Sequence, residues 1–252
     1  MVIAVLNSKG GVGKTATAVG LAAALAAPRR RVLLVDLDSQ ACASHWCGVS
    51  RNQLRPSAAS VLFEKYPILK AIRHTSAPHL DVLTGSLELA NADLALASLR
   101  GREIAVRRML ERVQAHYELI VIDCPPSLSL LSINAILASD GVIVPVTAEP
   151  LAADALEVMV ASLDRVRARM QATTRMLGIV LTQLDRRRPI TRETAERLRA
   201  EYRDQVFHTE LRWSAAIAAA PALRRLPSPT DAFRRLGGEV LHRLATARHA
   251  RP

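Results

Sequence analysis

The sequence predicts a doubly wound α/β fold, in which a mostly parallel sheet carries helices on both faces. Short apolar, β-branched runs of the kind that form buried parallel strands recur along the chain, beginning at residues 2–6. Helical segments separate these runs, which is the pattern of parallel strands joined by crossover helices. A glycine-rich loop joins the first strand to an Ala- and Leu-rich helix at residues 16–27.

The loop after the first strand has the composition of a phosphate-binding loop. It consists of Lys9, Gly10, Gly11, Val12, Gly13, Lys14 and Thr15, and Ala16 follows. Glycines let backbone N–H groups approach phosphate oxygens, and the helix N-terminus adds its positive dipole end. We therefore expect Lys14 to reach the β- and γ-phosphates and the Thr15 hydroxyl to ligate Mg²⁺. The alternative is a plain tight turn, but the strand–loop–helix context favours a phosphate site.

Two further buried strands end in carboxylates. The strand at residues 31–38 places Asp36 and Asp38 at its carboxyl end, and the strand at 118–123 ends at Asp123. In an open α/β sheet the carboxyl ends of the strands form the edge where ligands bind. An apolar strand that closes on Asp is what a carboxylate holding the Mg²⁺-bound water requires, which makes Asp123 the candidate.

The other elements alternate in the same way. We expect helices at residues 57–64, 67–73, 87–99, 102–116, 130–138 and 151–170, and strands at 80–84, 141–146 and 177–183. His45, Trp46 and Cys47 lie together, but one histidine and two nearby cysteines do not make a zinc ligand set, so a packed loop is the better interpretation.

Composition limits the class of protein. A chain of 252 residues is long enough for one domain with a well-buried core, and aromatic residues make up only 3% of it, so the core must consist mostly of Ala, Leu, Val and Ile. The net charge is +11, and all but four of the 34 basic residues are Arg. This excess fits either the bias of a GC-rich genome or a surface that binds a polyanion.

Cysteine usage and hydropathy indicate a cytoplasmic location. Three cysteines, without a C-x-x-C pair and without a signal peptide, are typical of a reduced compartment. No uninterrupted apolar run reaches the length of a membrane span, so we expect no membrane partner.

The phosphate loop, with its additional Lys9, resembles the deviant Walker A motif KGGVGKT of the ParA/MinD branch of P-loop ATPases. The segment with Asp36, Asp38 and Gln40 resembles the family's DxDPQ motif, and residues 123–128 resemble its DCPPSL switch. The resemblance continues through segments of residues 101–152 and the TQLDRR segment, so it covers nearly the whole chain. Ser39 and Ala41 stand where the family usually has Pro and Gly, so the rigidity that those two residues give the loop is not expected here.

The resemblance implies a mechanism and partners. Lys9 would cross a dimer interface to the partner's nucleotide, Asp38 would position the attacking water, and Asp36 would support the Mg²⁺ shell. The implied cofactors are ATP and Mg²⁺, and the implied function is DNA segregation by a ParA-type ATPase. The implied partners are a second copy in an ATP-dependent homodimer, non-specific double-stranded DNA on the nucleoid and a ParB-like centromere-binding protein. Residues 1–252 would form a single P-loop ATPase domain without an N-terminal helix-turn-helix domain.

Arginines gather in the second half of the chain. In ParA-type proteins, basic residues of the corresponding region bind DNA without sequence preference, and no signature of base readout is present here. The candidate DNA-binding residues are Arg186, Arg187, Arg188, Arg212, Arg224 and Arg225. Solvated helix faces in an Arg-rich protein are the alternative.

Three other functions compete with DNA segregation. A MinD-like membrane ATPase needs a C-terminal amphipathic helix with large apolar residues, which residues 240–245 do not provide. An orphan ParA-like ATPase that positions a protein cargo would have the same motifs. A ligase on this scaffold has no reason to carry Lys9. An iron–sulfur reductase needs two suitably placed cysteines, which this chain lacks.

Overall fold

The computed structural model describes residues 1–212, 226 and 230–249. Their strands form one sheet in the order β3-β4-β2-β5-β1-β6-β7-β8, and every neighbouring pair is parallel except β3 with β4. The strands are β1 (Val2–Val5), β2 (Val32–Asp36), β3 (Ile72–His74), β4 (Leu80–Leu83), β5 (Leu119–Asp123), β6 (Gly141–Thr147), β7 (Arg175–Leu184) and β8 (Leu211–Arg212).

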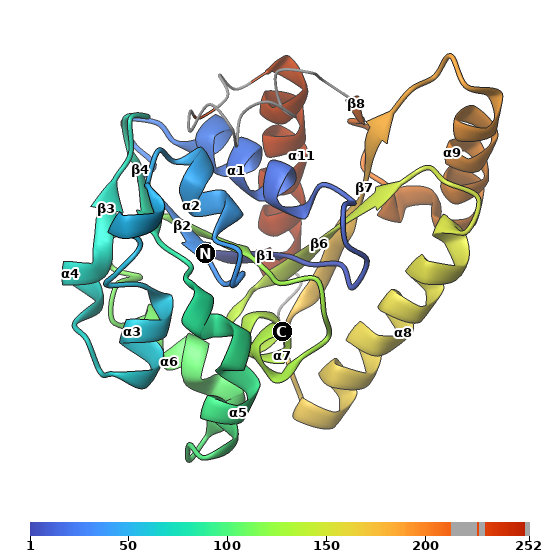
Figure 1. Cartoon of the computed structure of the whole chain (residues 1–252). Coiled ribbons are helices and arrows are strands. Elements are labelled where there is room, and N and C mark those ends of the chain that lie inside the picture. Colours follow the sequence, from blue (N-terminus) through green and yellow to red (C-terminus); the bar gives the residue numbers. More distant parts are fainter. Residues whose placement is uncertain (213–225, 227–229, 250–252) are drawn as a thin grey trace.

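Helices cover both faces of this sheet (Figure 1). One face carries α1 (Lys14–Leu25), α2 (Cys42–Trp46) and α11 (Asp231–His249). The other carries α3 (Ala58–Phe63), α4 (Ile68–Ala71), α5 (Ala92–Ala97), α6 (Ala105–Glu111), α7 (Leu130–Ala138), α8 (Ala152–Met170) and α9 (Pro189–Tyr202). The predicted doubly wound α/β fold is thereby confirmed.

The core has two layers because the strands β1, β2, β4, β5 and β6 are buried on both faces. In β2, Leu33 and Val35 pack into the cluster with α5–α8, whereas Val32 and Leu34 pack into the cluster with α1 and α11. This alternation follows from the two-residue period of a strand, and continuous β-branched and Leu runs are what such burial requires. The carboxyl ends of β1, β2 and β5 therefore converge on one edge, where the chain has its phosphate loop.

Helix α11 packs on α1 through a close approach at a glycine. A Cβ atom added to Gly20 would lie 2.4 Å from ring atoms of Phe233, so only glycine fits at this point of α1. Phe233 is 1% exposed. The helix that starts at the phosphate loop is therefore held from behind by the last helix of the described chain.

Several predicted elements differ in the structure. Residues 72 and 73, predicted as the end of a helix, belong to the antiparallel strand β3 because Ile72 pairs with Leu83 at the sheet edge. The helix predicted at 87–99 begins with a 3₁₀ segment (Leu87–Asn91), and the one at 102–116 begins with another (Arg102–Ile104) and ends at Glu111. After that residue the chain continues as turns, in which the N–H groups of Val113 and Gln114 both donate to the Leu110 carbonyl.

Pro145 lies inside β6 rather than at its end. Strand β1 pairs with β6 only as far as Ile143, and the chain then turns away into the phosphate loop. The side of Pro145 that lacks an N–H faces this gap, where its carbonyl accepts a hydrogen bond from the Asn7 side chain at 2.7 Å. A proline is tolerated there because no ladder hydrogen bond is lost. Among the described helices, none has the length and hydropathy of a membrane span.

Candidate nucleotide site

The phosphate loop follows β1 and leads directly into α1, at the carboxyl edge of the sheet (Figure 1). Its backbone is in the left-handed region at Gly11 (φ 76°) and Gly13 (φ 82°). Glycine adopts this conformation without steric cost. A Cβ at Gly10 or Gly11 would meet no atom within 4 Å, so both glycines face open space. The loop therefore has the glycine conformation that lets backbone N–H groups approach a phosphate.

Lys14 lies inside the loop. Its ammonium donates a hydrogen bond to the Lys9 carbonyl at 2.8 Å, and only 6% of the residue is exposed. Burial lowers the pKa of Lys14, while the nearby Asp123 and Asp38 carboxylates oppose this effect. The ammonium therefore lies between the loop and the acidic strand ends, where a β- or γ-phosphate would be bound.

Three side chains that sequence reasoning missed hold the outer side of the loop. Asn7 accepts a hydrogen bond from the Lys9 N–H at 2.9 Å. The Thr182 hydroxyl donates to the Val12 carbonyl at 2.8 Å, and the Gln183 amide donates to the Gly11 carbonyl. These bonds tie the Gly11 and Val12 carbonyls to the end of β7 and fix the start of the loop at the Lys9 N–H. Thr182 and Gln183 belong to the TQLDRR segment, but only the fold shows that the end of β7 reaches the loop.

Asp36 and Asp123 are register partners in adjacent strands. Asp123 is fully buried, and neither of its carboxylate oxygens has a hydrogen-bond partner among the described residues. Burial and the Asp36 carboxylate raise the pKa of Asp123, and the neighbouring Thr15 hydroxyl and Lys14 act in the opposite direction. A buried, unpartnered carboxylate beside a threonine hydroxyl has the chemistry to bind a divalent cation, and the metal-binding roles of Thr15 and Asp123 stay predictions.

Asp36 has a different environment from Asp123. One of its oxygens accepts from the Ser44 N–H and hydroxyl at 2.9 and 2.7 Å, and the other accepts from the Asp38 N–H at 3.1 Å. Burial raises the pKa of Asp36 to about 6. Gly85 approaches this carboxylate so closely that a Cβ would lie 2.9 Å from it. Asp36 thus organises the loop after β2 and leaves half-buried Asp38 facing the site.

The acidic residues do not form a complete metal site without a ligand. Across the part of the chain that the structure describes, no group of three or more His, Cys, Asp or Glu side chains is placed to hold a metal ion. A cation at Asp123 and Thr15 would need further oxygen ligands, and phosphate oxygens in the adjoining loop can supply them.

Lys9 points away from the position that Lys14 fills. Its ammonium forms an ion pair with Glu149 at 2.6 Å, on the rim of the loop, where the two side chains are 42% and 57% exposed. The Lys9 carbonyl and N–H, in contrast, belong to the internal hydrogen bonds of the loop. The two lysines of the loop therefore have separate environments, one internal and one at the surface.

The described candidate DNA-binding arginines differ in how they are held. Arg186 forms a two-point ion pair with Glu210, at 3.0 and 2.6 Å, and Arg187 pairs with Asp185 at 2.8 Å. Arg188 has no side-chain partner in the described chain. All three line a cavity of about 780 Å³ together with Arg212, Glu149 and Gln183. The cavity adjoins the phosphate loop because Gln183 contacts Gly11.

The remaining two candidates, Arg224 and Arg225, lie outside the described residues.

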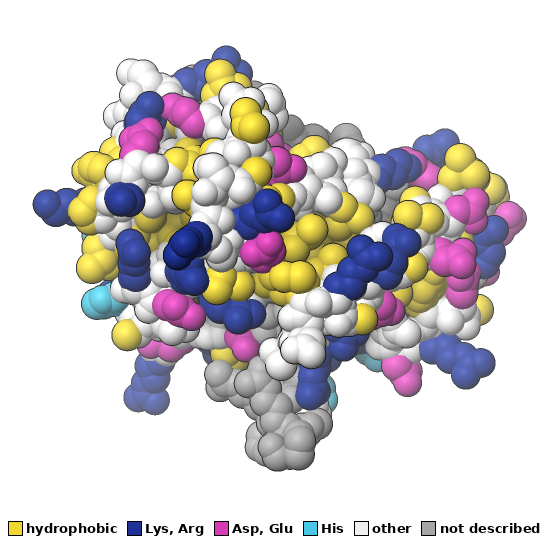
Figure 2. Space-filling model, turned by 90° about the horizontal axis from the view of Figure 1, so that it is seen from below, with side chains coloured by type: hydrophobic (Ala, Val, Ile, Leu, Met, Phe, Trp, Pro, Cys, Tyr) yellow, Lys and Arg dark blue, Asp and Glu magenta, His cyan; other side chains and the backbone are white. Residues whose placement is uncertain are grey.

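On the face seen from below relative to Figure 1, Lys and Arg side chains are interspersed with acidic and apolar ones (Figure 2). The positive charge is therefore not concentrated on this face, which distinguishes it from the arginine-lined cavity at the end of β7.

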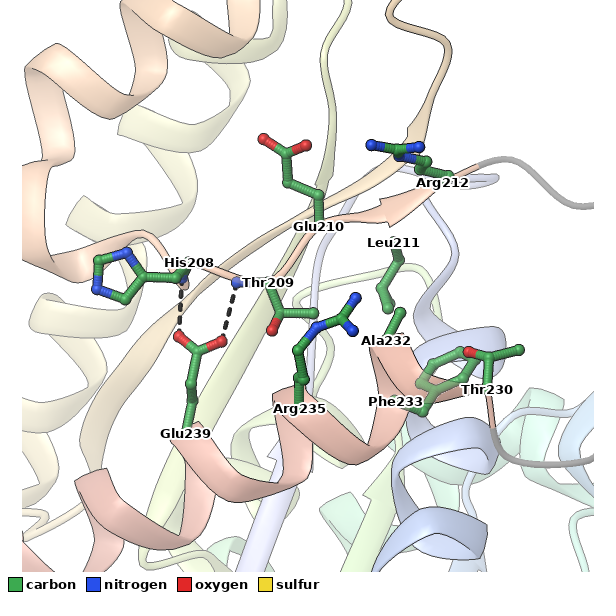
Figure 3. A pocket seen from close by; sticks show the side chains of 10 residues that line it. All are labelled: His208, Thr209, Glu210, Leu211, Arg212, Thr230, Ala232, Phe233, Arg235 and Glu239. Carbon is green, nitrogen blue, oxygen red and sulfur yellow. Dashed lines mark hydrogen bonds between the residues drawn. The ribbon is translucent and has the colours of Figure 1, made fainter.

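A second cavity of about 790 Å³ lies between β8 and α11 (Figure 3). Glu239 closes one end by accepting hydrogen bonds from the N–H groups of His208 and Thr209, each at 2.8 Å. The chain that connects its two walls, from residue 213 to 229, lies almost entirely outside the described residues. We assign no ligand to this cavity.

A family model described as an AAA domain matches residues 1–176. The sporulation initiation inhibitor protein Soj of Bacillus subtilis is 36% identical over 221 residues, which are 88% of this chain and 87% of Soj. The chain belongs to the ParA/MinD family of P-loop ATPases. The family assignment made from the deviant Walker A motif is thereby confirmed.

Two further comparisons agree with membership of the ParA/MinD family. The chromosome partitioning protein ParA of Caulobacter vibrioides is 36% identical over 223 residues, covering 88% of this chain and 84% of that protein. A crystal structure titled cobyrinic acid a,c-diamide synthase from Mycobacterium smegmatis, with bound ADP and magnesium, superposes with a TM-score of 0.84 at 30% identity and covers 97% of this chain and 95% of that chain. The P-loop fold of the family is therefore present over nearly the full length.

Proposed function

We propose that this chain is a ParA-type ATPase that segregates DNA. It binds ATP and Mg²⁺, forms a homodimer with two nucleotides at the interface, and in that state binds double-stranded DNA without sequence preference on the nucleoid in the cytoplasm. A ParB-like centromere-binding protein stimulates hydrolysis and releases the dimer. We further propose that residues 1–252 form a single P-loop ATPase domain.

The chemistry of the proposed site is hydrolysis of the β–γ phosphoanhydride of ATP. The loop N–H groups and Lys14 bind the phosphates, while Thr15 and Asp123 hold the cation. When bound, Mg²⁺ neutralises charge on the β- and γ-phosphate oxygens. Asp38 orients the attacking water, and Asp36 fixes the backbone of Asp38 through its hydrogen bond to the Asp38 N–H.

The position of Lys9 carries the proposal. Since Lys14 already occupies the interior of the loop, a second lysine on the exposed rim has no function toward the nucleotide of its own subunit. A partner subunit that docks on this face would receive its ammonium. The ligase alternative has no reason to carry a lysine at this place, and the reductase alternative lacks suitably placed cysteines.

The cavity at the end of β7 supports the DNA-binding step. Arg188 and Arg212 are exposed there without an acidic partner in the described chain, and dimerisation doubles the number of such arginines. Phosphate contacts of this kind release counterions, so the affinity for DNA falls steeply as salt increases.

The test is to measure dimerisation and binding of a random-sequence duplex with ATP, with ADP and without nucleotide, for the parent and for Lys9→Ala. We expect binding and dimerisation only with ATP, and loss of both in the variant. Dimerisation without DNA binding would instead favour a MinD-like or orphan ParA-like ATPase with a membrane or protein cargo. The absence of any ATP-dependent dimer would overturn the ParA-type switch.

A further inference from the structure

Glu149 lies at the point where the phosphate loop meets the loop after β6. It follows the end of β6 by two residues, and its backbone N–H donates to the Thr147 carbonyl at 2.9 Å, which fixes the turn. From this turn its carboxylate reaches the Lys9 ammonium at 2.6 Å. The two residues are 140 positions apart in sequence. Folding of the sheet alone brings them together, because β6 is the neighbour of β1.

The electrostatic environment of Glu149 stabilises its charged form. Lys9 lowers the pKa of Glu149, first through the hydrogen bond and also through its charge, and Arg188 contributes in the same direction. The carboxylate is therefore ionised near neutral pH and forms a charge-assisted hydrogen bond with the lysine. The Lys9 ammonium is held beside its own chain by a partner that belongs to the same chain.

We infer that Glu149 retains Lys9 within its own subunit and thereby opposes dimerisation until ATP is bound. This inference rests on the proposed function, because it concerns the lysine that would reach the partner's nucleotide. The Lys9 ammonium is held 2.6 Å from Glu149 of its own chain, so turning it toward a phosphate across an interface would lengthen or break this contact. Each subunit must break this ion pair before the dimer closes, so Glu149 is a positioning residue that sets the protein concentration at which the ATP-bound form assembles.

The size of the effect follows from the exposure of the pair. An exposed ion pair contributes a factor of roughly 1.4 to 5 to an equilibrium constant, and two pairs break for each dimer formed. Glu149→Gln should therefore tighten ATP-dependent dimerisation by roughly 2- to 30-fold. Because salt screens exposed charges, the difference between parent and variant should shrink at about 1 M salt.

A matched control is available elsewhere on the surface. Arg55 and Glu64 also form an exposed ion pair at 2.6 Å, with side chains 55% and 48% exposed, on a different part of the chain. Glu64→Gln removes a pair of the same length and similar exposure without touching the phosphate loop, and Arg55 keeps a second ion pair with Glu88 at 2.9 Å. It should leave the dimerisation constant unchanged.

The experiment has two readouts. The first is the dimer dissociation constant with ATP, by sedimentation, for the parent, Glu149→Gln and Glu64→Gln. The second needs no dimer: with selectively ¹³C-labelled lysine, the chain gives Cε signals from only four lysines, and Lys9→Arg assigns one of them. In protein without nucleotide, Glu149→Gln should shift the Lys9 signal, and Glu64→Gln should not.

The outcomes separate the inference from the function on which it rests. A Lys9 signal that does not respond to Glu149→Gln overturns the ion pair, whatever the dimer does. An unchanged or weaker dimer in Glu149→Gln also overturns the inference, because Glu149 would then have no effect or would act across the interface. If the signal shifts but the parent never dimerises with ATP, the proposed function fails while the ion pair stands.

Discussion

The Thr182 hydroxyl donates a hydrogen bond of 2.8 Å to the carbonyl oxygen of Val12, across 170 residues of sequence. Thr182 is 3% exposed and Val12 is 2% exposed, so this bond is shielded from water. It fixes the outer side of the phosphate loop to the end of β7. The loop is therefore shaped before any phosphate arrives, and we expect Thr182 to affect nucleotide affinity through the shape of the loop.

We expect Thr182→Val to weaken ATP binding, because valine keeps the shape of threonine but cannot donate to Val12. A hydrogen bond of this type contributes about 0.5–1.5 kcal/mol, which corresponds to a roughly 2- to 12-fold rise in the ATP dissociation constant. Titration calorimetry measures the ATP dissociation constant. Thr182→Ser retains the hydroxyl and should remain within about twofold of the parent, and equal losses in both variants would contradict a role for the hydroxyl.

Lys14→Ala should remove most of the affinity for ATP. The ammonium is buried and provides the internal positive charge of the loop, and loss of a buried charge partner costs roughly 2 kcal/mol or more. Fluorescence titration with a labelled ATP analogue measures the change. Lys70→Ala, at an exposed lysine outside the site, is the control and should bind like the parent. Retained affinity in Lys14→Ala would show that the phosphates are bound elsewhere.

Arg188→Gln and Arg212→Gln should each weaken non-specific DNA binding and reduce its salt dependence by about one counterion per site. Both side chains are exposed and without an acidic partner in the described chain, so their charge is available to phosphates. Anisotropy titrations of a random duplex at several salt concentrations give both quantities. Arg187→Gln, at an arginine already paired with Asp185, should have a smaller effect. An equal salt slope in all three variants would place the DNA on another surface.

Gly20→Ala and Gly238→Ala should have opposite effects on stability. Both positions are helical, so the intrinsic gain of alanine over glycine is about 1 kcal/mol in each. At Gly238 a Cβ meets nothing within 4 Å, whereas at Gly20 it overlaps the Phe233 ring. Overpacking of this kind costs about 1–3 kcal/mol. The free energies of unfolding of the two variants, measured with urea, should differ by this amount. Phe233→Leu should partly restore the Gly20→Ala variant.

Asp81 should account for part of the stability that the protein loses as the pH falls below about 4. Burial alone would raise its pKa, but hydrogen bonds from Tyr117, His74 and Arg31, at 2.8, 2.6 and 3.0 Å, outweigh burial and hold the pKa below its ordinary value. A carboxyl with a depressed folded-state pKa contributes stability above its unfolded pKa, near 3.9, and this contribution disappears as the pH falls through the folded value.

The Asp81→Asn variant tests this pH dependence. At pH 7 its urea midpoint of unfolding should be lower than that of the parent. The difference between the two midpoints should narrow as the pH drops below 4. Asp231→Asn, at an exposed carboxylate paired only with Arg234, provides the comparison and should follow the parent curve. A constant difference across the acid range would mean that Asp81 acts through packing rather than through its charge.

The sequence predicted the fold and the identity of the loop because both depend on local patterns. A buried strand followed by glycines and a helix can be recognised without knowing its neighbours, and the aspartates mark strand ends directly. The role of Asp36 was less predictable. Its carboxylate accepts hydrogen bonds from the N–H and hydroxyl of Ser44, eight residues further on. These contacts, which the strand pattern does not encode, engage the carboxylate with the loop after β2.

Contacts between distant segments could not be predicted in this way. Thr182, Gln183 and Glu149 reach the phosphate loop only because β6 and β7 lie beside β1 in the sheet, and no periodicity encodes that order. Strand β3 was missed for the same reason, since its pairing with β4 decides its conformation. The roles of Lys9, Asp38 and the arginines in hydrolysis and DNA binding remain predictions.

The strand order also has a consequence for how the protein is made. Strand β1 leaves the ribosome before the other described strands, yet its neighbours β5 and β6 are encoded more than 100 residues later. The nascent phosphate loop thus has neither Asp123 nor Thr182 beside it until most of the chain has been translated. Synthesis that stops before residue 182 leaves a loop without its Thr182 hydrogen bond, so an incomplete product cannot form the full nucleotide site.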